Sequence, residues 1–131
     1  MTIQFRSVRV HEVPEQVTAI EERNFIHEVQ KDLDTERPRL VLDCSRVQSM
    51  DIATMRLLLS CLEIAMKRNG DVRLASLPQG AETSLKLAGV DRLFEMFATT
   101  ADAIQSYHRR PASILPEQAN DGIAGDSEYA A

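Results

Sequence analysis

The stretch LVLDCSRVQSMDIATMRLLLS, residues 40–60, decides the fold because it joins a strand pattern to a helix pattern. With Arg39 in front of it, RLVLDC is a short run rich in branched apolar residues, which is typical of a central strand covered on both faces. From Met55 to Met66 the chain is apolar except for a narrow polar stripe at helical spacing. We therefore expect a central strand followed by a largely buried helix.

The flanking segments continue this alternation of strands and helices. The expected strands span residues 3–10, 39–44, 71–77 and 92–97, and further helices are expected after the Thr18–Glu21 capping box, at 81–88 and at 100–109. Strands that alternate with helices of crossover length favour right-handed connections and a parallel sheet. The sequence thus predicts an α/β fold with a mostly parallel or mixed sheet of four to five strands, covered by about four helices.

Composition and charge indicate a single globular domain. The 131 residues are 44% hydrophobic and 27% charged, and the formal net charge is -5. Aromatic residues make up only 5%, and no basic stripe is available to neutralise phosphates. Nucleic acid is therefore not expected as a partner.

The C-terminal segment differs in composition from the rest of the chain. Residues 111–131 contain four acidic residues, no Lys or Arg, two Pro and two Gly, and they show no apolar periodicity. Such a segment cannot bury enough apolar area to offset the entropy of ordering. We expect a domain over residues 1–110 and a flexible acidic tail over residues 111–131.

No set of residues typical of catalysis, metal binding or nucleotide binding stands out. The three histidines are isolated from one another, and the five glycines do not form a phosphate-binding loop. Asp43 and Asp51 bracket a loop in the manner of a receiver-type acidic site, but the opening strand supplies no acidic pair to complete it. We expect a protein that is not an enzyme and has no catalytic residues, cofactor or metal.

The N-terminus and the cysteines point to the cytoplasm. MTIQFRSVRV alternates and carries charges, so it lacks the apolar segment of a secretory signal or a membrane span. Cys44 and Cys61 do not have the spacing of a metal-binding pair, and buried thiols are the simplest interpretation. A cytoplasmic location without membrane insertion is expected.

The junction around Asp51 is the candidate functional site. Asp51 suits an N-cap, because its carboxylate can accept hydrogen bonds from the first amides of the helix. The turn that follows begins at the carboxyl end of a central strand, where open α/β sheets present their binding surfaces. An apolar first turn there predicts a docking site with the residues Asp51, Ile52, Ala53, Thr54, Met55 and Arg56.

In its ordered series of motifs the chain resembles the STAS domain, the fold of anti-sigma factor antagonists, from about Ile3 to Tyr107. In that family a pattern D-L-S-x-V-x-x-(hydrophobic)-D-S-S-G-L precedes a long helix, and a glycine step and L-x-G-(hydrophobic)-x-x-(hydrophobic)-F follow. The matching residues here are Asp43 to Val47, Met50-Asp51, Gly70 and Leu87 to Phe94.

The resemblance implies a non-enzymatic partner switch. Its partner would be an anti-sigma factor, usually a serine kinase of the histidine-kinase-like ATPase type, and the outcome would be control of sigma-factor-dependent transcription. In the family, phosphorylation of the second Ser of D-S-S-G releases the partner. Ala53 replaces that Ser here, and Thr54 is a displaced candidate whose hydroxyl can equally bond its own backbone. The usual phosphoserine switch is therefore expected to be missing.

Two other functions remain open from the sequence. The same fold could serve as a STAS accessory subunit of a membrane ABC-type lipid transport ATPase, which needs no phosphorylated Ser. An enzyme or nucleotide-binding protein is a third reading, but it lacks a catalytic set or a phosphate cradle. A homodimer is a further assembly that the sequence allows.

Overall fold

The computed structural model describes residues 8–108 as four parallel strands alternating with four α-helices. The strands are β1 (Val8–Glu12), β2 (Arg39–Asp43), β3 (Asp71–Ala75) and β4 (Glu95–Phe97). The helices are α1 (Ala19–Leu33), α2 (Ile52–Met66), α3 (Gln79–Ala88) and α4 (Thr100–His108), with a short 3-10 helix η1 (Asp91–Leu93) before β4. The predicted α/β fold is confirmed.

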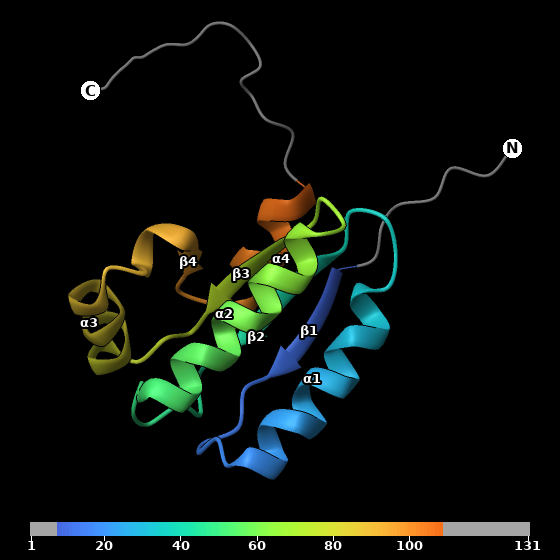
Figure 1. Cartoon of the computed structure of the whole chain (residues 1–131). Helices are drawn as coiled ribbons and strands as arrows, with labels where there is room; N and C mark the ends of the chain where they lie inside the picture. The colour runs from blue at the N-terminus through green and yellow to red at the C-terminus, as the bar shows by residue number, and fades with distance from the viewer. Residues whose placement is uncertain (1–7, 109–131) are drawn as a thin grey trace, which may run out of the picture.

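The sheet has the order β1-β2-β3-β4, and all three strand pairs are parallel. Helices α1 and α2 lie on one face, with α3 beside them, and α4 lies on the other face (Figure 1). β2 is central and buried on both sides, because Leu40 and Leu42 enter the larger core while Val41 packs with α4. The apolar run therefore behaves as the sequence predicts.

Tyr107 fixes α4 to the sheet. Its hydroxyl lies 2.9 Å from the carbonyl oxygen of Leu40 and 2.8 Å from that of Asp71, at the starts of two neighbouring strands. The guanidinium of Arg73 stacks 4.0 Å from the centre of the tyrosine ring. These contacts close the second face of the sheet and leave the carboxyl edge as the place where the loops before α1 and α2 gather.

Several predicted strand boundaries are wrong. The first strand ends at Glu12 instead of residue 10, while residues 3–7 of the predicted segment lie outside the described residues. β2 ends at Asp43 and β3 at Ala75, one and two residues before the predicted ends. The predicted strand 92–97 is a strand only from Glu95, because residues 91–93 form η1 and turn the Leu93 side chain outward. The pattern of apolar residues is the same in a 3-10 turn and a short strand over so few residues.

The two cysteines are buried free thiols, as expected. Burial raises the pKa of both Cys44 and Cys61 to about 12, so neither is a thiolate near neutral pH. The predicted tail, residues 111–131, lies outside the described part of the chain.

Candidate functional site

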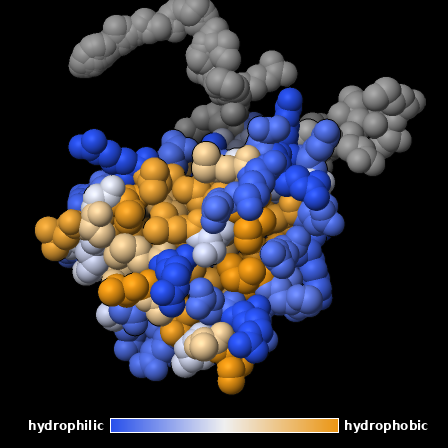
Figure 2. Space-filling model, viewed as in Figure 1, coloured by the Kyte–Doolittle hydropathy of each residue, from blue (hydrophilic) through white to orange (hydrophobic). Residues whose placement is uncertain are grey.

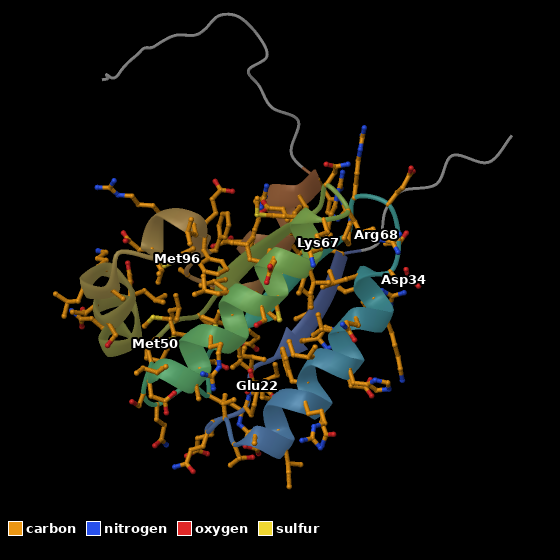
Figure 3. All side chains as sticks on the ribbon, in the orientation of Figure 1. Glu22, Asp34, Met50, Lys67, Arg68 and Met96 are labelled. Atoms are coloured by element: carbon orange, nitrogen blue, oxygen red, sulfur yellow. The ribbon has the colours of Figure 1, made fainter. Side chains whose placement is uncertain are left out.

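The site begins with a loop that is anchored from beneath. Between β2 and α2, the side chains of Val47 and Met50 are buried, and the Cys44 amide donates to the carbonyl of Ala75 at 2.8 Å. Figure 3 shows Met50 at the lower end of α2, beside the turn that starts the helix. These contacts position Asp51 at the carboxyl edge of the sheet.

Asp51 caps α2 as the sequence predicts. Its Oδ1 accepts a hydrogen bond from the Thr54 amide at 2.8 Å, and its carbonyl accepts from the Met55 amide at 2.9 Å. The Thr54 amide, and then the Thr54 side chain, lower the pKa of the Asp51 carboxyl by hydrogen bonding. The carboxylate is exposed and stays ionised at neutral pH.

The first turn of α2 divides into an exposed and a buried side. Ile52 is 79% exposed, whereas Thr54 is 1% exposed and faces the interior. Ala53 and Met55 are half-buried, and Met55 packs against the core. Ile52 is therefore the most exposed apolar side chain of this turn.

Arg56 completes the predicted set and joins α2 to α1. Its Nε lies 3.6 Å from the Glu22 carboxylate, and Figure 3 shows Glu22 between the lower halves of α1 and α2. Sequence reasoning missed Glu22, because no local pattern links residues that are more than thirty positions apart. Arg46, in the loop, makes a similar bridge to Glu12 at 3.6 Å. The docking turn is thus flanked by two ion pairs, whose residues are exposed except for the half-buried Glu22.

The carboxyl edge does not form a metal site within residues 8–108. The register places Glu12 beside Asp43, but the described residues contain no group of three His, Cys, Asp or Glu side chains that could hold an ion. The Asp43 carboxylate accepts from the Ser45 amide at 3.0 Å and so shapes the loop. A receiver-type acidic site is not assembled there.

Removal of the cap should destabilise the fold in a pH-dependent way. Asp51→Ala is expected to lower the free energy of unfolding by about 1 kcal/mol at pH 7, since the Thr54 amide loses its acceptor. The folded-state pKa of Asp51 is lowered, so the contribution of the charge is complete above the unfolded pKa of about 3.9 and is lost as the pH falls through the folded value. Urea unfolding at pH 7 and pH 3 measures the difference, and a gap that widens in acid would contradict this account.

The fold and this turn together define a small α/β domain that presents an exposed apolar turn at the carboxyl edge of its sheet. The family model described as "Mlab, STAS domain" matches residues 4–96, well over half of the chain. The chain therefore belongs to the STAS domain family, as the sequence resemblance indicated.

Solved structures of the same fold come from several proteins. An anti-sigma-factor antagonist (STAS) domain protein from Planctomyces limnophilus is 15% identical, with 76% of this chain and 90% of that chain covered and a TM-score of 0.66. The STAS domain of a SulP transporter from Vibrio cholerae is 16% identical, covering 81% and 84%, with a TM-score of 0.65. A Thermotoga maritima protein, provisionally assigned as an anti-sigma factor antagonist, is 20% identical, covering 77% and 82%, with a TM-score of 0.62.

At these identities the structural matches show the fold alone. No curated protein matches the sequence of this chain. Between residues 8 and 108, no helix combines the length and the hydropathy that a membrane span requires.

Proposed function

We propose that this chain is a regulatory binding module that docks a partner protein through the first turn of α2. The partner is an anti-sigma factor or serine kinase of the histidine-kinase-like ATPase type, and binding controls sigma-factor-dependent transcription. The observation that carries the proposal is the 79% exposure of Ile52 at the capped start of α2. A large apolar side chain in that position supplies a docking anchor.

The family supports this choice of partner. The STAS fold is shared with the anti-sigma-factor antagonist domain of Planctomyces limnophilus. In this chain the turn keeps the aspartate that begins the family's D-S-S-G pattern and places Ala53 at the position of the phosphorylated Ser. Docking through the turn would therefore be independent of phosphorylation.

A second candidate is an accessory subunit of a membrane transport ATPase of the ABC type. The similarity to a SulP transporter STAS domain favours this candidate, since the same fold there is part of a transport protein. The missing hydroxyl at Ala53 is equally compatible with a subunit that is never switched by phosphate.

Identification of the partner separates the two candidates. The tagged full chain is expressed in its native host, crosslinked and purified, and the attached proteins are identified by mass spectrometry. A kinase-type ATPase or an anti-sigma factor supports the first candidate, and a membrane fraction that carries a transport ATPase supports the second. A chain that crosslinks to neither would contradict both.

The chain should not accept phosphate from its partner kinase. Ala53 offers no hydroxyl, and the Thr54 side chain is 1% exposed, so a kinase cannot position it for in-line transfer without opening the helix. Intact-mass spectrometry after incubation with the kinase and ATP is expected to show the unmodified mass.

The matched variant Ala53→Ser restores an acceptor at a half-buried position. It is expected to gain one phosphate and then to release the partner, because a charge of about -1.5 to -2 enters the turn beside Asp51. A phosphate mapped to Thr54 in the unaltered chain would refute the prediction that this turn lacks a phosphorylation switch, and would establish Thr54 as a shifted acceptor.

A further inference from the structure

An exposed seam runs along the whole length of α2 and continues beyond the docking turn. Ile52 is 79% exposed and Met66 is 61% exposed, and Leu59, halfway between them, is partly exposed. These three apolar side chains are spaced seven residues apart. Arg56 and Glu63, both exposed, fall between them and are also seven residues apart.

The seam has the spacing of a helix–helix interface. Its residues follow each other at intervals of four, three, four and three, which places them on one side of a helix as in a coiled coil. The opposite side of α2 is buried through Leu57, Leu58, Cys61, Leu62 and Ala65, so the seam must face outward.

The arrangement of the helices and the surface of this face agree with this orientation. Figure 1 shows α2 in front of the sheet, between α1 and α3. Figure 2 shows apolar residues gathered across the middle of the same face, with hydrophilic residues at its border over α1. Four of the five seam residues, Ile52, Arg56, Glu63 and Met66, are exposed, and Leu59 is partly buried against the core.

We propose that the seam binds a second copy of this chain, with the two α2 helices antiparallel and crossing near Leu59. In that arrangement Ile52 of one copy lies opposite Met66 of the other, since each is seven residues, or about 10 Å, from the crossing point. Measured along the helix axis from Leu59, Arg56 lies about 4.5 Å toward the N-terminus and Glu63 about 6 Å toward the C-terminus. Each arginine therefore meets the glutamate of the other copy, and two-fold symmetry makes this ion pair twice.

The charges select the antiparallel arrangement. A parallel pair would place Arg56 against Arg56 and Glu63 against Glu63, and like charges across an interface are unfavourable. Among residues 8–108, Arg56 is bridged to Glu22 at 3.6 Å, with side-chain exposures of 61% for Arg56 and 26% for Glu22. Because the arginine lies in solvent, this bridge is weak enough to exchange. Glu63 makes no ion pair with any residue in the described range.

Self-association would compete with partner binding, a consequence that rests on the proposed function. Ile52 lies in both surfaces, so one copy cannot use it for the dimer and for the partner together. A contact made by one helix of 15 residues is smaller than the roughly 1,200 Å² of a stable interface, so the dimer should be weak and readily displaced. Partner binding would therefore shift the equilibrium from dimer to monomer.

The test measures the mass of the purified full chain by analytical ultracentrifugation between about 5 and 500 μM, where weak dimers of this size form. The unaltered chain should pass from monomer to dimer. Arg56→Glu and Glu63→Arg should each weaken self-association by at least about tenfold, because each creates two like-charge contacts. An equimolar mixture of these two variants should dimerise again, since every seam charge then meets its opposite.

The control is Lys31→Glu on the exposed side of α1, which makes the same change in charge as Arg56→Glu outside the seam. It should dimerise like the unaltered chain. The inference would be overturned if the chain were monomeric at every concentration. It would also be overturned if neither charge reversal weakened self-association.

Met66→Glu separates this inference from the proposed function. Met66 is 14 residues from Ile52, or about 21 Å along the helix. The variant should lose the dimer and still bind the partner identified above. If the chain is monomeric and Met66→Glu instead abolishes partner binding, the seam belongs to the partner and the dimer is refuted, while docking through α2 stands.

Discussion

Leu58→Ala is expected to lower the free energy of unfolding by about 2–5 kcal/mol, the largest effect of any single change considered. Leu58 is 0% exposed and lies in the main core, between α2 and the sheet. Truncation removes the transfer free energy of the lost methyl groups and leaves a cavity that the rigid sheet cannot collapse to fill. The midpoint of urea unfolding measures the loss.

The control for this change is Leu87→Ala on α3. Leu87 is 84% exposed, so the same truncation removes little buried area and should change stability by less than about 0.5 kcal/mol. Similar losses in the two variants would mean that α2 does not bury the side of the helix described above.

Gly70→Ala is expected to cost about 3 kcal/mol, at the upper end of the range for overpacking. A Cβ at this position would lie 2.3 Å from the Pro38 carbonyl oxygen and 2.5 Å from its Cδ. The strand starts cannot move apart to relieve the clash, because the Asp71 amide donates to that same carbonyl at 3.0 Å. The added methyl group must therefore disrupt either the hydrogen bond from Asp71 to Pro38 or the pairing of β2 with β3.

The chain offers a second glycine as the matched control. A Cβ at Gly80, in the first turn of α3, has no atom within 4 Å. Gly80→Ala should be neutral or stabilise the fold by up to about 1 kcal/mol, because alanine restricts the unfolded chain and favours the helix. Equal destabilisation by both changes would remove the steric explanation for Gly70.

The sequence predicts the fold well where a pattern is long. The run RLVLDC and the helix after Asp51 extend over enough residues for their periods to be distinguished, and both appear where expected. Gly89 closes α3 with a φ of 77°, as its position after the last apolar residue indicates. The start of the three-residue strand β4 was predicted wrongly, because its pattern is too short to be distinguished from that of η1.

The candidate site was predictable as a location and less so in its details. Its residues follow from the cap at Asp51 and the family pattern. Which side chains of the first turn point outward depends on how α2 rotates against the sheet, and the apolar residues on almost every side of this helix leave that rotation open. The burial of Thr54 and the exposure of Ile52 therefore could not be predicted from the sequence and are known only from the structure.

In the proposed function, Ile52 anchors the partner protein. This role is tested by the dissociation constant of the identified partner, measured by isothermal titration calorimetry for the unaltered chain, Ile52→Glu and Gln30→Glu. Gln30 is exposed on α1, so its variant adds the same negative charge outside the turn. We predict at least about tenfold weaker binding for Ile52→Glu, as for a lost interface anchor, and no more than about a twofold change for Gln30→Glu. An unchanged dissociation constant for Ile52→Glu would contradict docking through this turn.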